Sequence, residues 1–178
     1  METLLVLDRQ LFLLINGLLH PPLADSLALF FSGVGRAGFI WFVIALFVFI
    51  REEKKDRWFF APFLLTGGLS YFVSEIFIKP LVGRIRPLVE MGAIIVDNQS
   101  TDPSFPSGHA TIAFAMAVVL TNKEPKWKWI FYTLAIAIAW SRIYLGNHYP
   151  LDVIVGGLLG WSIGKISLPL VQLTHRKE

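Results

Sequence analysis

The chain has 178 residues, of which 54% are hydrophobic and only 16% are charged. Soluble domains usually carry about 25% charged residues, so this composition excludes a disordered chain and argues against an ordinary soluble globule. There is no cysteine, which excludes disulfides, a thiol nucleophile and thiolate metal sites. A net charge of +3 in so apolar a chain favours anionic lipids as partners, and we expect no nucleic acid. The expectation is one integral membrane domain over residues 1–178.

The first fifty residues permit two interpretations. Residues 4–19 are short for a span and contain two charges, and residues 23–50 are long and broken around Arg36. One interpretation has spans at 4–19 and 39–50, with a kinked outer segment between them. The other has a first helix lying at the membrane interface, followed by one long, tilted span. We favour the first interpretation.

Four later segments approach the roughly 20 apolar residues that a helix needs to cross a bilayer. They are residues 58–78, 105–121, 127–145 and 151–171. The sequence therefore predicts an all-α, polytopic membrane helix bundle with six transmembrane helices, or five under the second interpretation. Small residues allow close helix packing in membranes. The glycines expected to do so are Gly67, Gly68, Gly156, Gly157, Gly160 and Gly164.

The basic residues predict the orientation of the bundle. By the parity of the spans, residues 51–57, 122–128 and 175–178 lie on one side, and they hold nine of the 16 lysine and arginine residues. Cytoplasmic loops carry an excess of such residues. This side is therefore expected in the cytoplasm, and the long loop 80–104 faces outward.

The outward side collects polar residues from three separate parts of the chain. Ionisable residues at membrane depth are costly and are functional candidates. Arginine forks suit phosphate oxygens, and a helix N-terminus attracts anions. A helix is expected to start here with Ser104 as its N-cap and Pro106 in its first turn. The candidate phosphate-binding residues are Lys79, Arg86, Ser107, Gly108 and Arg142.

Two histidines supply candidate reactivity. His148 and Asp152 lie four residues apart, and a carboxylate bonded to one ring nitrogen leaves the other nitrogen free to attack. His109, beside the expected phosphate site, is a candidate general acid. Glu75 precedes Lys79 by four residues, so we expect an ion pair that holds Lys79 toward the phosphate. For Arg84 we expect contact with lipid headgroups.

Three sequence blocks resemble the type 2 phosphatidic-acid phosphatase superfamily. They are Lys79-x6-Arg86-Pro87, then Pro106-Ser107-Gly108-His109, then Ser141-Arg142-x5-His148-x3-Asp152. The resemblance covers residues 60–165. Within it, residues 139–157 are similar to undecaprenyl-diphosphate phosphatases and lipid A 1-phosphatases.

The resemblance implies a role for each matching residue. His148 becomes phosphorylated, Asp152 orients it, and His109 protonates the leaving group and then activates water. The remaining signature residues bind the phosphate. It also implies that the enzyme needs no metal or other cofactor.

The expected function is therefore hydrolysis of the terminal phosphate of a lipid phosphate or diphosphate. The expected place is the outer face of a bacterial inner membrane. Undecaprenyl diphosphate is the first choice of substrate, with lipid A 1-phosphate and phosphatidylglycerophosphate as rivals. A lipid phosphotransferase and a non-catalytic phospholipid binder or transporter remain alternatives. No obligatory protein partner is expected.

Overall fold

The computed structural model describes residues 2–51 and 58–175, with side chains described as far as Val171. This part of the chain is helical and contains no strand, which confirms the all-α expectation. The longer helices are α1 (Glu2–Asn16), α2 (Pro22–Gly35), α3 (Phe39–Arg51), α4 (Ala61–Tyr71), α6 (Gly108–Lys123), α7 (Lys128–Tyr144) and α8 (Pro150–His175). The short elements are η1 (Arg36–Gly38), the π-helical η2 (Phe72–Ile78), α5 (Lys79–Val82), η3 (Val89–Met91) and η4 (Pro125–Trp127).

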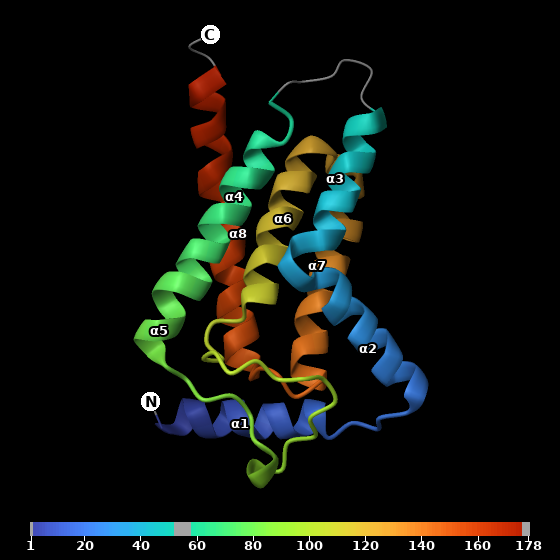
Figure 1. The fold of residues 1–178 in the computed structure, drawn as a ribbon, viewed down its shortest axis with the longest axis vertical. Helices are drawn as coiled ribbons and strands as arrows, with labels where there is room; N and C mark the ends of the chain where they lie inside the picture. Colours follow the sequence, from blue (N-terminus) through green and yellow to red (C-terminus); the bar gives the residue numbers. More distant parts are fainter. Residues whose placement is uncertain (1, 52–57, 176–178) are drawn as a thin grey trace.

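Helix α1 lies across one end of the bundle instead of running along it (Figure 1). Its buried residues include Asp8 and Asn16, which turn toward the other helices. The Asn16 side-chain amide donates to the backbone carbonyls of Ile94 and Tyr144, at 2.8 and 2.9 Å. At the end of the bundle these polar groups have hydrogen-bond partners. In a helix exposed to hydrocarbon they would have none. The favoured prediction of a span at 4–19 is therefore wrong, and the second interpretation fits.

Helices α2 and α3 continue into one another through η1. Together they form a stretch of 30 residues, Pro22–Arg51, long and apolar enough to cross a membrane. The break that the sequence places around Arg36 is a kink, where Ala37 has φ 50° and Gly38 has φ 75°. The outer segment predicted between residues 19 and 39 is thus wrong, because most of it forms α2, the first half of this stretch. Two further stretches, Ala61–Val82 and Pro150–Val171, also have spanning length and composition.

Helix α6 forms the centre of the bundle and packs closely on α8. A Cβ added at Gly160 would lie 1.9 Å from the Thr111 carbonyl oxygen, and one at Gly156 would lie 2.6 Å from that of Ser107. The expectation that Gly156 and Gly160 serve helix packing is confirmed, and Gly164 meets α6 in the same way. Gly68 has no such neighbour. This contact fixes the start of α6 beside the start of α8.

The ends of α3, α6 and α8 lie together at the end of the bundle opposite α1 (Figure 1). Arg51 and Lys123 belong to this end, as the predicted distribution of basic residues requires. Lys126 and Lys128 follow at the same end, and the other five of the nine basic residues lie at 52–57 and 176–178, outside the described residues.

Candidate active site

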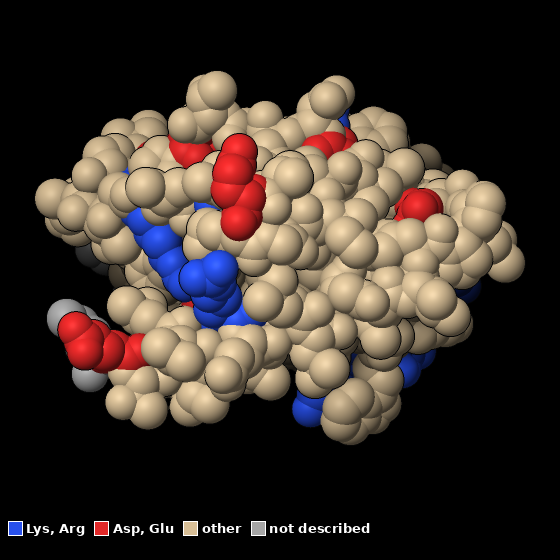
Figure 2. Space-filling view, turned by 90° about the horizontal axis from the view of Figure 1, so that it is seen from below, with Lys and Arg blue, Asp and Glu red and all other residues tan. Residues whose placement is uncertain are grey.

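A cavity of about 270 Å³ opens near the end of the bundle that α1 crosses. Four separate segments line it, and they bring together most of the predicted site residues. The predicted residues in its lining are Glu75, Lys79, Arg86, Gly108, His109, Arg142 and His148. Figure 2 views the molecule from the α1 end and shows basic side chains gathered beside acidic ones.

The N-terminus of α6 forms one wall of the cavity. The helix starts at Gly108 with Ser107 at the N-cap position, so the prediction of Ser104 as the cap is wrong. Ser104 instead donates its backbone N–H to the Arg84 carbonyl at 2.7 Å. Ser107 Oγ and His109 Nε2 are buried and have no hydrogen-bond partner among the described residues. Of the two residues, His109 lines the cavity and Ser107 does not, so the free His109 nitrogen is the one within reach of a ligand there.

His148 lies in the turn between α7 and α8, which Gly146 shapes with φ +81°. Its Nε2 lies 3.2 Å from Arg86 Nη1. A guanidinium only donates, so Nε2 carries the lone pair and the proton belongs on Nδ1. Nδ1 faces Asp152 Oδ2 across 3.6 Å, longer than a hydrogen bond. His148 and Asp152 thus lie close together, as predicted, but without a hydrogen bond between them. The His148 Nε2 atom points toward the cations of the cavity.

Burial also keeps the His148 ring neutral. It lowers the pKa of His148 to about 4, helped by the nearby charges of Arg86 and Arg142 and opposed by Asp152. A ring with this pKa is unprotonated at neutral pH, and only the unprotonated ring is a nucleophile.

Lys79 and Arg86 are already paired with carboxylates. Lys79 Nζ donates to Glu75 Oε2 at 2.7 Å, so the predicted ion pair forms. Lys79 also pairs with Asp102, and Arg86 Nη2 donates to Asp102 Oδ1 at 3.0 Å. Burial raises the pKa of Asp102, but the hydrogen bonds from Lys79 and Ser100 and the nearby positive charges outweigh it and leave that pKa lowered. Sequence reasoning missed Asp102.

Glu75 has a second contact that accounts for Gly108. A Cβ at Gly108 would lie 1.9 Å from Glu75 Oε1. The glycine therefore lets the Glu75 carboxylate approach the start of α6, where free backbone N–H groups favour an anion. The π-helical η2 carries Glu75 and precedes Lys79, and such segments are frequent at functional sites.

Arg142, near the end of α7, closes the cavity from the α2 side. Its Nη1 donates to Ser32 Oγ and lies 3.3 Å from Asp97 Oδ2. Its Nε is buried and has no partner among the described residues. The contacts of Nη1 therefore fix the position of the guanidinium, and Nε–H is left as a hydrogen-bond donor without a partner among the described residues.

Arg84 does not take the headgroup role expected for it. Its Nη1 donates to Asp152 Oδ1 and its Nη2 to Asp8 Oδ2, both at 2.5 Å. Both carboxylates are buried. The guanidinium is therefore occupied inside the protein.

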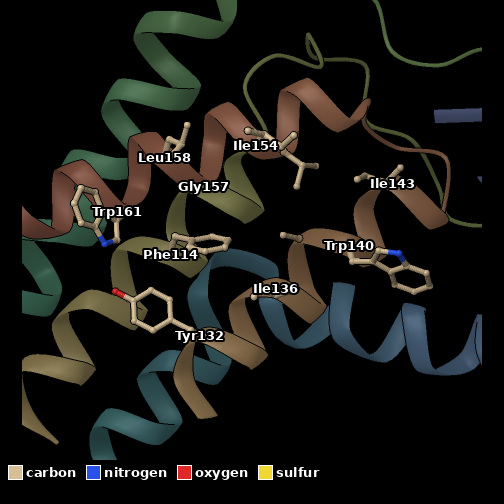
Figure 3. Close-up of a pocket in the computed structure, with 11 residues that line it drawn as sticks. Phe114, Tyr132, Ile136, Trp140, Ile143, Ile154, Gly157, Leu158 and Trp161 are labelled. Atoms are coloured by element: carbon tan, nitrogen blue, oxygen red, sulfur yellow. The ribbon is translucent and has the colours of Figure 1, made fainter. Parts of the chain in front are cut away.

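A larger cavity of about 550 Å³ lies between α7 and α8, with Phe114 of α6 at its base. Figure 3 shows its lining of aromatic and aliphatic side chains, including Trp140 and Trp161. It shares no lining residue with the cavity of His148 and carries no charged group. The smaller cavity is therefore the candidate active site. In the described part of the chain, no group of three or more His, Cys, Asp or Glu residues is arranged to hold a metal.

Comparison with known proteins defines the class. Residues 59–176 match the PAP2 superfamily. An undecaprenyl-diphosphatase of Sulfolobus acidocaldarius is 32% identical over 166 residues, which cover 90% of this chain and 77% of that protein. The crystal structure of Aquifex aeolicus LpxE is 34% identical with a TM-score of 0.73, covering 90% of this chain and 93% of LpxE.

A more distant structure shares the fold. It is a transmembrane PAP2 type phosphatidylglycerolphosphate phosphatase from Bacillus subtilis, at 21% identity with a TM-score of 0.74, covering 99% of this chain and 88% of that one. The matches together define a multi-pass membrane lipid phosphatase. The chain belongs to the PAP2 superfamily.

Proposed function

We propose that the enzyme hydrolyses the terminal phosphate of a lipid diphosphate through a phosphohistidine on His148. The observation that carries this proposal is the orientation of His148, whose Nε2 lone pair points at Arg86. Lys79, His109 and Arg142 line the same cavity. The neutral imidazole of His148 lies among the cations Lys79, Arg86 and Arg142. It is therefore suited to attack a phosphorus atom whose oxygens those cations hold.

In the first step the Nε2 lone pair forms a bond to the terminal phosphorus. The bond from that phosphorus to the leaving oxygen breaks, and the oxygen takes the electron pair and a proton from His109. Lys79 and the two arginine forks hold the negative oxygens of the phosphoryl group. As His148 becomes positive, Asp152 stabilises the charge through Nδ1–H.

In the second step a water oxygen attacks the phosphorus of the phosphohistidine. His109, now neutral, takes the proton from that water, and the N–P bond breaks with its electrons returning to Nε2. The products are a lipid monophosphate and inorganic phosphate. Ser107 and the backbone at Gly108 bind the phosphoryl oxygens throughout, because a helix N-terminus stabilises an anion.

The preferred substrate is undecaprenyl diphosphate, supported by the relative named for that activity. Lipid A 1-phosphate and phosphatidylglycerophosphate are the rival substrates. The active-site end of the bundle faces the periplasm of a bacterial inner membrane. This orientation rests on the excess of basic residues predicted for the other end.

Phosphate release by detergent-purified protein in EDTA tests the proposal. The substrates are undecaprenyl diphosphate, lipid A, phosphatidylglycerophosphate, phosphatidic acid and a water-soluble phosphate ester. We expect release from the lipids, fastest from the diphosphate, and loss of turnover by at least about 10³-fold in His148→Ala, since removal of a catalytic nucleophile has effects of this order. Acid-quenched protein incubated with ³²P-labelled substrate should carry an acid-labile label that the variant lacks.

Three results would overturn the proposal. Near-normal turnover by His148→Ala would refute the phosphohistidine. Label transfer to an added acceptor lipid in place of water would identify a phosphotransferase. Lipid binding without phosphate release, retained in His148→Ala, would identify a binder.

A further inference from the structure

We propose that Arg84 is a positioning residue that fixes the Asp152 carboxylate for His148, and that Asp8 on α1 holds Arg84 in place. The inference rests on the proposed roles of His148 and Asp152. It makes α1, which the catalytic scheme above does not use, a working part of the active site.

Both oxygens of Asp152 are fixed, and each has a different partner. Oδ1 accepts from Arg84 Nη1 at 2.5 Å, and Oδ2 accepts from the Tyr149 backbone N–H at 2.9 Å. Oδ2 is also the atom that faces His148 Nδ1. Because two bonds on two oxygens fix the plane of a carboxylate, Arg84 sets the direction in which Oδ2 meets the imidazole.

Arg84 also provides the charge that a buried Asp152 needs. The Asp152 side chain is fully buried, and a buried carboxylate requires a hydrogen-bonded cation to stay ionised. An ionised Asp152 is required when His148 becomes positive on phosphorylation. Arg84 supplies this partner from the side of Asp152 that faces α1.

Asp8 determines where the Arg84 guanidinium lies. It accepts from Arg84 Nη2 with Oδ2 and from the Leu151 backbone N–H with Oδ1, at 2.5 and 2.8 Å. The guanidinium also lies over the Tyr149 ring, 4.0 Å from its centre. One carboxylate on α1 therefore ties the arginine to the first turn of α8, the turn that carries Asp152.

The geometry separates this role from substrate binding. Arg84 does not line the cavity of His148, and both of its terminal nitrogens are occupied by protein carboxylates. Arg84 thus acts through Asp152, whereas Arg86 contacts the reacting histidine itself.

Steady-state kinetics of Arg84→Gln and Asp8→Asn test the proposal. We expect kcat to fall about 10- to 100-fold, the range seen when outer partners of functional side chains are removed, with KM changed less than about twofold. Arg84→Lys should recover part of kcat, because it restores the charge without the two-pronged geometry. Arg9→Gln is the matched control. Arg9 neighbours Asp8 and, among the described residues, donates only to the Met91 carbonyl at 3.4 Å, so the kinetics of Arg9→Gln should match wild type.

A double-variant cycle shows whether Arg84 acts through Asp152. In an Asp152→Asn background, Arg84→Gln should lower kcat by less than about twofold. An independent loss in that background, or a change confined to KM, would overturn the inference and make Arg84 a substrate contact. If Arg84→Gln does not fold, Arg84→Lys and Asp8→Asn decide by the same criteria.

Failure of the proposed function gives a different pattern. If His148→Ala and Asp152→Asn keep turnover, the catalytic scheme is wrong. If they lose it while Arg84→Gln, Arg84→Lys and Asp8→Asn keep wild-type kcat, only the role of Arg84 is wrong.

Discussion

Asp102 pairs with two of the cations that bind the substrate phosphate in the proposed mechanism. Its carboxylate pairs with Lys79 and Arg86, and its backbone carbonyl accepts from Arg86 Nε at 2.9 Å. Arg86 Nη1 is used by the Asn147 carbonyl and His148, so all three nitrogens of this guanidinium are engaged. A phosphate reaches the fork only by displacing Asp102.

Asp102→Asn should therefore bind inorganic phosphate more tightly than wild type. The amide keeps the shape but removes the competing negative charge, so we expect the inhibition constant for phosphate to fall about tenfold, equivalent to 1.4 kcal/mol. Competition kinetics with a lipid substrate measure it. Glu90→Gln, an exposed acidic residue on the same loop, is the control. Weaker phosphate binding in Asp102→Asn would mean that Asp102 aligns the cations instead of competing with the ligand.

At the scale of the elements, the contact between α6 and α8 places the phosphate-binding end of one helix beside Asp152 of the other. The Ser107 backbone N–H donates to the Asp152 carbonyl at 2.9 Å. Glycines on α8 allow this approach, since a side chain there would overlap the backbone of α6. The helix contact and the active-site geometry therefore depend on the same few residues.

Gly160→Ala should destabilise the protein by about 1–3 kcal/mol, the usual cost of overpacking. The added methyl would lie 1.9 Å from the Thr111 carbonyl oxygen. A thermal melt in detergent measures the change. Gly68→Ala is the matched control, because nothing lies within 4 Å of its added Cβ, and it should be neutral or stabilising by up to about 1 kcal/mol. Equal melting temperatures for the two variants would contradict the packing argument.

The sequence predicts the later helices well and the first two poorly. The segments 127–145 and 151–171 agree closely with α7 and α8, because continuous apolar runs have few other ways to fold in a bilayer. The first helix is misplaced because its apolar composition suits a span, although residues 4–19 are short for one and contain two charges. The signal against a span was Asp8, whose partners Arg84 and Leu151 are distant in sequence.

At the candidate active site, too, some residues can be predicted from the sequence and others depend on partners that are distant in sequence. Residue type and spacing single out His148 and Arg86 as candidates, and the structure brings both to one cavity. They do not single out Asp102, because a carboxylate in a polar loop has many possible partners. Its role follows only from the fold that brings residue 102 beside Lys79 and Arg86.

At the scale of the whole molecule, the two ends of the bundle differ, and α1 lies across one of them. One end holds the cavity, and the opposite end carries Arg51, Lys123 and Lys126. Exposed leucines, including Leu4, Leu7, Leu11 and Leu14, run along α1. A helix with this pattern is suited to lie at the membrane interface.

Single-cysteine labelling tests this arrangement directly, because the natural chain has no cysteine. Cysteines at Glu2, Leu19 and Glu90 should all react with a membrane-impermeant maleimide added to spheroplasts, whereas one at Lys126 should react only after lysis. All four positions are exposed. Protection of position 2 with labelling at position 19 would show that residues 4–19 cross the membrane, and labelling at Lys126 alone would reverse the orientation.

The tie between Asp8 and the first turn of α8 also affects the order of assembly during synthesis. Asp8 is made 143 residues before its partner Leu151. His148, the proposed nucleophile, and its partner Asp152 emerge in the same later segment. In the proposed mechanism, a chain that has not yet reached this segment therefore holds the phosphate-binding residues but lacks the nucleophile. Insertion of α8 completes the α1 contact and the proposed catalytic group in one event, so we expect activity to begin only once α8 is in place.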